Sequence, residues 1–433
     1  MRDNFSLYKR LDWVLIILYL ALVFIGWVNI LASCGAGEDG TYNILDFGEK
    51  YGKQLIWICA SLVLAVIIIF VINPKLYNVF AWWIYGIMML ILVAVIFVGV
   101  DINGSRSWIR IGPLQIQPAE FAKIATIIAL SSLMSKYGFT LKKKIHFVEA
   151  VALIMLPTLL ILMEKEAGSA LVFFGLIFML YREGMSGWIL VIGGTVVLFF
   201  ILTLLWGPII TSIVLLGTLV VAFLIHNHYT SPHSKLKRKH LLIKYYILAL
   251  IMGIGMLFSV GFVFDNVLQP HQKARIEDLL GIKEDIMGVG YNVHQSKIAI
   301  GSGGLFGKGF LQGTQTKYDF VPEQSTDFIF CTVGEEWGFV GSLLVIILYA
   351  SLIIRIINRA EKSENRFTRI YGYSIACIFA MHVFINIGMT IGLAPVVGIP
   401  LPFFSYGGSS LWAFTILLFI FVRLDADRLQ VFR

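Results

Sequence analysis

Long apolar runs, separated by short polar segments, recur along the whole chain. A run of roughly 18 to 25 residues is long enough to cross the ~30 Å hydrocarbon core of a bilayer as a helix. Apolar runs lie near residues 13–32, 54–73, 77–99, 118–135, 147–163, 168–181, 187–206, 208–225, 243–264, 327–354, 370–393 and 405–422. The pattern predicts an all-α polytopic membrane protein with about twelve transmembrane helices.

Composition supports this assignment. Of 433 residues, 58% are hydrophobic and 14% are charged, which excludes an ordinary soluble globular protein. The first run, 13–32, is long enough to span and lacks a small-residue cleavage site, so we expect it to remain as the first helix of one membrane domain over 1–433. The cysteines are too widely spaced for a disulfide framework or a metal-ligand cluster: Cys34, Cys59, Cys331 and Cys377.

Basic residues set the expected orientation. Lys and Arg gather in every second connection between runs, and the positive-inside rule places such connections in the cytoplasm, together with both termini. The basic groups are Arg2, Lys9 and Arg10; Lys136 and Lys142 to Lys144; Lys235, Lys237, Arg238 and Lys239; Arg355, Arg359, Arg366 and Arg369; and Arg423 and Arg428. Because topology accounts for all of these groups, the net charge of +8 does not indicate a nucleic-acid partner.

The connection 265–326, on the opposite side, is exceptionally long. At about sixty residues it far exceeds the roughly two to eight residues that usually join packed helices, and long ordered loops often carry function. Within it, the glycine-rich stretch Gly301–Gly309 lies beside Lys297 and Lys308, where backbone N–H groups could hold a pyrophosphate. Glycine-rich stretches are also ordinary turns, and spacing alone selects no acid of the loop as catalytic.

A second polar cluster opens the fourth run. Pro118 suits the first position of a helix, which places Glu120 and Lys123 on one face at i and i+3. Charges at membrane depth are costly, so the two are expected to pair, either as a structural ion pair or within an aqueous site. Arg106 and Trp108, just before this helix, could contact an anion and a sugar, although both are also ordinary residues of a membrane interface.

Two further polar segments lie near the outer surface. Residues 322–329 open the run that carries the adjacent acids Glu335 and Glu336, which at that depth require a polar cavity. Prolines between 395 and 402 precede 405–410, so the backbone there should be irregular and should line a cavity or pack against protein. With the long loop, these segments predict one wet groove, partly inside the membrane, that suits an amphiphilic substrate.

These motifs resemble the SEDS family (shape, elongation, division and sporulation) of bacterial membrane proteins, to which RodA and FtsW belong. The resemblance covers most of the chain, and a match of so many motifs in the same order is specific to this family. It rests on Gly104–Trp108, Gln117–Lys123, Gly288–Tyr291, Gln295–Lys297, Gly301–Gly309, Pro322–Ile329 and Pro400–Ser409. The stretch 313–322 is more similar to the RodA branch, which acts in cell elongation, than to the FtsW branch, which acts in division.

The resemblance implies a peptidoglycan glycosyltransferase of the bacterial inner membrane, with its long loop on the outer, periplasmic side. Its substrate would be lipid II, an undecaprenyl-diphosphate-linked disaccharide pentapeptide. Its partners would be a class B penicillin-binding protein and the elongation machinery that maintains rod shape. In this family an essential acid precedes a Gly-x-Gly-Tyr motif, and the matching residue is Asp285. As a general base, Asp285 would take the proton of the attacking sugar hydroxyl in one inverting displacement.

The other candidate residues would hold the substrate or stabilise charge on the departing pyrophosphate. They are Arg106, Trp108, Glu120, Lys123, Gln295, Lys297, Lys308, Glu323, Asp327 and Ser405. A divalent cation, Mg²⁺ or Mn²⁺, is a further source of positive charge for this chemistry, and no other cofactor is expected.

The chain departs from the family pattern in three places. Family members usually have about ten spans, so the runs within 187–225 are expected to form a hairpin inserted into a core of ten. Where the family usually has Pro-Asp-Leu-Gly-Thr, this chain has Lys165–Ser169, and we assign Glu166 no catalytic role. Ile286 follows Asp285 where proline is common, which should change the rigidity of the loop.

Two other functions stay open on the residues alone. A flippase for the lipid-linked precursor would suit a broken last span and the acids Glu335 and Glu336. A transporter should, however, concentrate polar groups near the bilayer midplane, whereas here they lie near the outer surface. A scaffold that only anchors the penicillin-binding partner would tolerate neutralisation of the loop charges.

Overall fold

The chain forms two compact units, each described here by itself. The first comprises Met1–Met185 and Asn292–Arg433, and the second comprises Ser186–Tyr291. The computed structural model describes residues 7–34, 46–102, 105–112, 114–229, 235–266, 268, 270–282 and 290–428.

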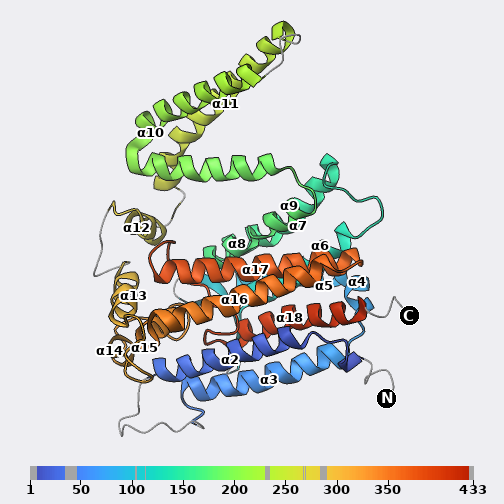
Figure 1. Cartoon of the computed structure of the whole chain (residues 1–433), viewed down its shortest axis with the longest axis vertical. Helices are drawn as coiled ribbons and strands as arrows, with labels where there is room; N and C mark the ends of the chain where they lie inside the picture. The colour runs from blue at the N-terminus through green and yellow to red at the C-terminus, as the bar shows by residue number, and fades with distance from the viewer. Residues whose placement is uncertain are drawn as a thin grey trace. The chain divides into compact units, whose positions relative to one another are not determined.

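The first unit is a bundle of long apolar helices. Figure 1 shows α2, α3, α16, α17 and α18 side by side with nearly parallel axes. The helices of this unit are α2 (Trp13–Ser33), α3 (Lys50–Phe70), α4 (Lys75–Val79), α5 (Ala81–Val98), α6 (Pro118–Met134), α7 (Lys144–Met163), α8 (Ala167–Phe173), α9 (Leu176–Arg182), α13 (Tyr291–Ser302), α14 (Thr314–Lys317), α15 (Ile329–Glu336), α16 (Gly338–Glu361), α17 (Arg366–Thr390) and α18 (Gly408–Arg428).

Burial divides these helices into a core and a periphery. In α18, 83% of the most apolar window is buried, and in α17 67%, against 28% in α3 and in α5. Nearly every residue of α6 is buried as well. Because α6, α17 and α18 form the centre, polar side chains on them face protein rather than lipid.

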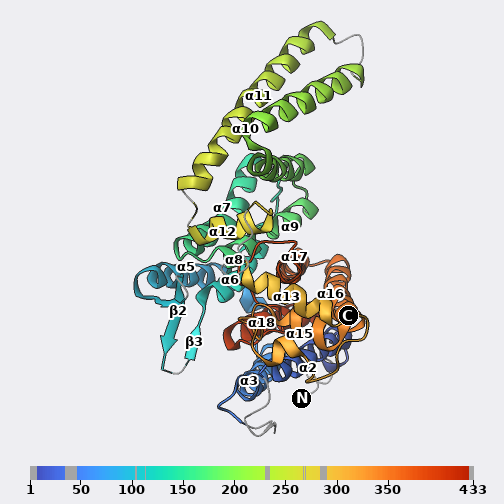
Figure 2. The same ribbon diagram turned by 90° about the vertical axis from the view of Figure 1, so that its left-hand side faces the viewer.

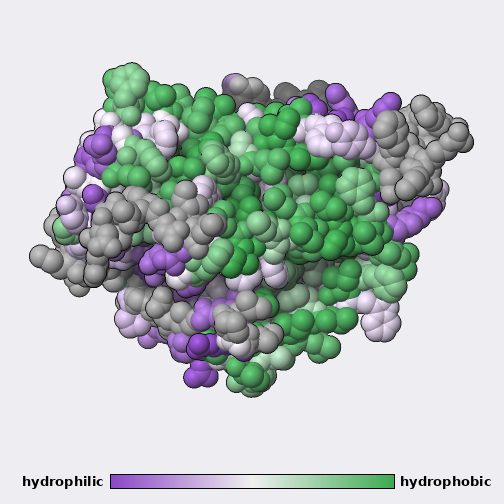
Figure 3. Space-filling model, turned by 90° about the horizontal axis from the view of Figure 1, so that it is seen from below, coloured by the Kyte–Doolittle hydropathy of each residue, from purple (hydrophilic) through white to green (hydrophobic). Residues whose placement is uncertain are grey.

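The outer helices present apolar side chains to their surroundings. Figure 3 shows hydrophobic residues over much of one face. Phe24 on α2 and Phe97 on α5 are 64% and 79% exposed. Exposed apolar surface on this scale is typical of contact with lipid. The chain is therefore a multi-pass membrane protein.

The number of spans agrees with the sequence prediction. Among the described residues, nine helices are long and apolar enough to cross a membrane. That count takes α10 once although it is kinked, and it leaves out the 17-residue α6 and the short pair α8 and α9. These three differences account for the twelve runs in the sequence.

A small antiparallel sheet joins α5 to α6, and the sequence analysis did not predict it. Its strands are β1 (Val100–Ile102), β2 (Ser105–Ile111) and β3 (Leu114–Ile116), in the order β1-β2-β3. In Figure 2, β2 and β3 form a hairpin that extends away from α5 and α6. Strand β2 has the sequence Ser-Arg-Ser-Trp-Ile-Arg-Ile, which lacks the strict alternation of polar and apolar residues that would predict a strand. The strands are also short, so periodicity alone does not predict them.

The second unit consists of α10 (Gly187–Tyr229), α11 (Lys235–Asn266) and α12 (Pro270–Leu279). The predicted runs 187–206 and 208–225 form the two arms of α10, joined by a kink at Gly207, where φ is +79°. Pro208 follows and has no N–H to continue the hydrogen bonding of the first arm. Phe199, Leu215 and Leu257 pack together, so both arms and α11 share one small core.

The region predicted as one long loop, 265–326, contains regular structure. Helix α11 continues to Asn266, and α12, α13 and α14 lie within the region. Whether the runs within 187–225 are an insertion in the family core stays a prediction.

Candidate functional site

The centre of the candidate site is an ion pair on the first turns of α6. Gln117 is the N-cap and Pro118 opens the helix, as the sequence predicted. Lys123 Nζ lies 2.8 Å from Glu120 Oε1, and the two side chains are 0% and 1% exposed. Burying both charges is costly unless further groups stabilise them.

Two residues from other elements complete the surroundings of Lys123. His382 on α17 places its Nε2 atom 2.8 Å from Lys123 Nζ. The Nδ1 atom of the same ring lies 3.1 Å from the carbonyl oxygen of Pro400. Phe414 on α18 lies beneath the ammonium, 5.0 Å from ring centroid to Nζ. The sequence analysis missed His382 and Phe414, because only the packing of α6, α17 and α18 brings them to Lys123.

Glu166, the N-cap of α8, connects this centre to the segment before α6. Its Oε1 atom accepts a hydrogen bond of 2.8 Å from Gln117 Nε2, and its Oε2 atom accepts one of 2.9 Å from Ser105 Oγ. It also contributes a favourable electrostatic interaction with Lys123. The sequence analysis gave Glu166 no role, although it occupies the position of an aspartate in the family motif and retains its charge.

Glu164 lies just beyond the end of α7 and is almost completely buried. Neither carboxyl oxygen has a hydrogen-bond partner within the described structure. Burial, together with the neighbouring charge of Glu166, raises the pKa of Glu164 from 4.5 to about 8. With this pKa, the carboxyl group of Glu164 is protonated near neutral pH. The backbone carbonyl oxygen of the same residue accepts a hydrogen bond of 3.1 Å from the Arg106 N–H, so the end of α7 is attached to β2.

The two polar segments near the ends of α15 and α17 are joined to each other. Ser405 Oγ donates to the carbonyl oxygen of Thr326 at 2.6 Å and accepts from Leu401 N at 2.9 Å. Asn386, one turn beyond His382 on α17, donates to the carbonyl oxygens of Asp327 and Ile399 at 2.8 and 2.7 Å. Of the predicted candidates, Asp327 and Ser405 are thus held together here.

Glu335 is fully engaged by the segment that precedes α15. Its Oε1 atom lies 2.7 Å from Lys308 Nζ. The carboxylate also accepts from the backbone N–H groups of Thr314, Gln315 and Thr316, at 2.8 to 2.9 Å. These groups form the N-terminus of α14, where a negative charge is favourable. Lys308 therefore holds this segment to α15, and Glu335 needs no aqueous cavity.

The glycine-rich stretch packs closely against α15. A Cβ atom at Gly303 would lie 2.0 Å from the carbonyl oxygen of Gly334, and one at Gly307 would lie 2.0 Å from that of Glu336. Gly307 also has φ of +79°. The close approach of the two backbones thus explains why glycine occupies positions 303 and 307. This favours the interpretation of the glycine-rich stretch as ordinary turns over its interpretation as an anion-binding site.

The remaining candidates lie at the margins. Arg106 is exposed on β2, with Nε 3.9 Å from Asp101 Oδ2, and Trp108 is half-buried on the same strand. Gln295 and Lys297 are on α13 and half-buried and exposed, respectively. Glu323 is exposed, has φ of +55°, and accepts from Thr326 Oγ1 at 2.8 Å. Asp285, the predicted base, lies outside the described residues.

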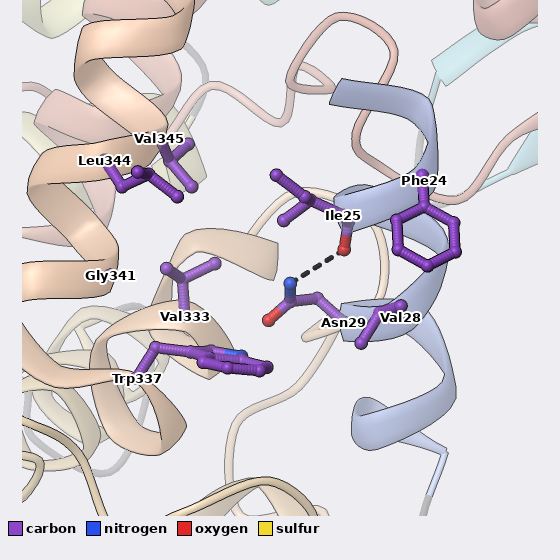
Figure 4. A pocket seen from close by; sticks show the side chains of 9 residues that line it. All are labelled: Phe24, Ile25, Val28, Asn29, Val333, Trp337, Gly341, Leu344 and Val345. Atoms are coloured by element: carbon purple, nitrogen blue, oxygen red, sulfur yellow. Dashed lines mark hydrogen bonds between the residues drawn. The ribbon is translucent and has the colours of Figure 1, made fainter. Parts of the chain in front are cut away.

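Figure 4 shows an apolar cavity of about 160 Å³ between α2 and the segment from α15 to α16. Val333, Trp337 and Leu344 face it from one side, and Phe24 and Val28 face it from α2. Its lining is too apolar to hold a pyrophosphate, so it is not part of the candidate site.

The fold and the site define a class: a polytopic membrane protein with buried charges at the centre of its helical bundle. A family model for FtsW, RodA and SpoVE, described as cell cycle proteins, matches residues 12–235 and 239–430. The chain therefore belongs to this family.

Relatives and solved structures agree with the family assignment. The peptidoglycan glycosyltransferase RodA of Treponema pallidum is 30% identical over 440 residues, covering 96% of this chain and 98% of the relative. The peptidoglycan glycosyltransferase MrdB of Escherichia coli is 32% identical over 403 residues, covering 93% and 90%. A chain of a peptidoglycan synthase complex that coordinates polymerisation and crosslinking has a TM-score of 0.68 and 26% identity, covering 97% and 99%. The rod shape determining protein RodA of Thermus thermophilus has a TM-score of 0.60 and 25% identity, covering 96% and 97%.

Proposed function

We propose that this protein is a peptidoglycan glycosyltransferase that polymerises glycan strands from lipid II during cell elongation. The observation that carries the proposal is the Glu120 and Lys123 pair. It is buried at the start of α6, in a chain that is similar over nearly its whole length to named peptidoglycan glycosyltransferases. A buried, preorganised ammonium is suited to stabilise charge on a departing pyrophosphate.

Each residue of the site has a distinct role in this reaction. Lys123 binds a pyrophosphate oxygen of the donor, and Glu120 keeps the amine protonated and in place. Glu166 fixes the N-cap residue Gln117 and so the start of α6. Asp285 takes the proton from the attacking sugar hydroxyl, which typically contributes ~10² to 10⁴ in rate. The acceptor then displaces the pyrophosphate in one inverting step, without a covalent intermediate.

The engagement of Glu335 favours an enzyme over a flippase. A transport route needs polar groups that are available to the passing headgroup at membrane depth. Both oxygens of Glu335 are engaged within the protein, by Lys308 and by the N–H groups at the start of α14. Glu335 is therefore a structural group, which removes one of the two acids that suited a flippase.

The setting of the enzyme forms part of the proposal. We place it in the bacterial inner membrane, with both termini cytoplasmic and the region 265–326 on the periplasmic side, because the basic connections obey the positive-inside rule. A class B penicillin-binding protein and the elongation machinery are its proposed partners. The similarity to a chain of a complex that coordinates polymerisation and crosslinking supports such a partner.

A divalent cation also stays a proposal. Within the described residues, no three His, Cys, Asp or Glu side chains are grouped as metal ligands. A Mg²⁺ or Mn²⁺ ion would then enter with the pyrophosphate of lipid II, where it adds positive charge beside the leaving group.

The purified protein with its transpeptidase partner tests the proposed function directly. Incubated with lipid II, it should form glycan strands that a muramidase digests, and a Lys123→Met variant assayed well below its own thermal midpoint should form far fewer. Translocation of lipid II across liposomes without polymer formation would instead identify a flippase. If neither activity is found, the protein would be a scaffold that only anchors the penicillin-binding partner.

A further inference from the structure

His382 is a buried polar residue of the central helix α17 that the reaction scheme above does not use. It is 0% exposed and touches three groups from three other elements. These are Lys123 on α6, the carbonyl of Pro400 in the segment between α17 and α18, and the edge of Phe414 on α18, with ring centroids 4.8 Å apart.

The contacts determine which nitrogen of His382 carries the hydrogen. A carbonyl oxygen can only accept, so the Nδ1 atom facing Pro400 must be the donor. In the neutral ring, Nε2 then has a free lone pair. An ammonium can only donate, so the Lys123 N–H donates to that lone pair. A neutral His382 and a charged Lys123 therefore satisfy both hydrogen bonds of the imidazole ring.

The same contacts direct the ammonium of Lys123. Among the described residues, Glu120 Oε1 and His382 Nε2 are its hydrogen-bond acceptors, each at 2.8 Å. They use two of the three N–H groups, and the ring of Phe414 lies below. A lysine side chain is flexible, and an ammonium bound by Glu120 alone could rotate about that contact. The second acceptor removes this freedom and leaves one N–H for a substrate oxygen.

We propose that His382 is a positioning residue for Lys123. Its Nε2 atom orients the ammonium of Lys123 toward the pyrophosphate of the donor, and its Nδ1 atom holds the ring to the segment that contains Pro400. The inference rests on the proposed function, because Lys123 is given its role there. Since Asn386 ties the same segment to Asp327, movement of the segment changes the direction of Lys123 through His382. The third N–H of the ammonium therefore points toward the pyrophosphate only while the Pro400 segment keeps its hydrogen bonds to His382 and Asn386.

A purely structural role for His382 makes a different prediction. In that case its contribution is the hydrogen bond to Pro400, which keeps a buried carbonyl satisfied. Two substitutions separate the roles. The amide of asparagine reaches the position of Nδ1, so His382→Asn keeps a donor for Pro400 and removes the acceptor for Lys123. Glutamine reaches the position of Nε2, so His382→Gln keeps the acceptor and removes the donor.

The test compares both variants with wild type in glycan polymerisation from lipid II, with KM, kcat and thermal midpoint measured for each. We expect His382→Asn to raise KM for lipid II by ~10-fold, the cost of one misdirected hydrogen bond to a charged group, and His382→Gln to restore most of the wild-type value. A larger defect in His382→Gln than in His382→Asn, or equal KM values in all three proteins, would overturn the proposal. Absence of polymer with wild type would instead overturn the proposed function.

Discussion

Glu166 Oε1 accepts a hydrogen bond of 2.8 Å from the side-chain amide of Gln117, so the N-cap of α8 holds the N-cap of α6. The two residues are 49 positions apart in the chain. Pro118 sets the start of α6 locally, and this bond holds that start, with Glu120 and Lys123 on the turns that follow, against the start of α8. The relationship gives a function to a glutamate that the sequence analysis left without one.

Substitution of Glu166 tests this connection. Glu166→Ala removes acceptors from Gln117 and Ser105 and a negative charge near Lys123, so we expect polymerisation to fall by at least ~10-fold. Lys165→Gln is a matched control, because the neighbouring lysine side chain is exposed. Steady-state rates with lipid II distinguish the two. Equal rates for both variants would show that the position of α6 does not depend on Glu166.

Glu164 makes stability depend on pH. Its pKa is raised by burial from 4.5 to about 8 in the folded protein, so ionisation of this group costs more in the folded than in the unfolded state. Its contribution to stability is complete below pH 4.5 and is lost as pH rises through about 8. Glu164→Gln imitates the protonated form. Its thermal midpoint should match that of wild type at pH 5 and exceed it by a few degrees at pH 8. A constant difference between the two proteins across this range would contradict the raised pKa.

Asp12 joins α2 and α16 at the opposite end of the bundle. It accepts from Val14 N at the start of α2 at 3.1 Å and from Arg355 on α16 at 2.9 Å, and it also pairs with Arg359. The side chain of Asp12 is 1% exposed. Asp12→Ala leaves Arg355 without this carboxylate and Arg359 with Asp425 alone, at 3.6 Å. An uncompensated buried charge typically costs ~3 to 5 kcal/mol, and the partial exposure of the two arginines reduces that cost.

The expected result is a large fall in thermal midpoint in detergent, with little change in KM for the protein that remains folded. Asp427→Ala is the matched control, since its pair with Arg423 is longer, at 3.4 Å, and the side chain of Asp427 is 29% exposed against 1% for Asp12. Similar midpoints for the two variants would mean that Asp12 does not join these helices in the way described.

Lys308 and Lys123 were both candidates for binding pyrophosphate, and the structure separates them. Lys308 is engaged by Glu335 and Thr314, whereas Lys123 directs its ammonium from a buried pair with Glu120. We expect Lys308→Met to lower the thermal midpoint and leave KM for lipid II nearly unchanged. Lys123→Met should raise KM and lower kcat, and its thermal midpoint should fall as well, because Glu120 is left buried without its partner. A raised KM in Lys308→Met with an unchanged KM in Lys123→Met would return Lys308 to the binding site.

The sequence predicted the features that depend on local pattern. The apolar runs gave the membrane-spanning helices, and Pro118 with the i and i+3 spacing gave the Glu120 and Lys123 pair. The same reasoning could not find His382, 259 positions from Lys123, because a lone histidine in an apolar helix does not indicate its neighbours. Nor could it assign Glu335, whose acceptors are filled by backbone N–H groups about 20 residues earlier. Such contacts depend on how the helices pack, which periodicity does not specify.

Polymerisation of purified lipid II by the full chain with its transpeptidase partner tests both the enzyme and its general base, in a comparison of wild type, Asp285→Asn and the control Asp278→Asn. We expect glycan strands from wild type and from Asp278→Asn, and none from Asp285→Asn at an unchanged thermal midpoint. Strands from Asp285→Asn at the wild-type rate would contradict the assignment of the general base, and no strands from any of the three proteins would contradict the assignment of the enzyme.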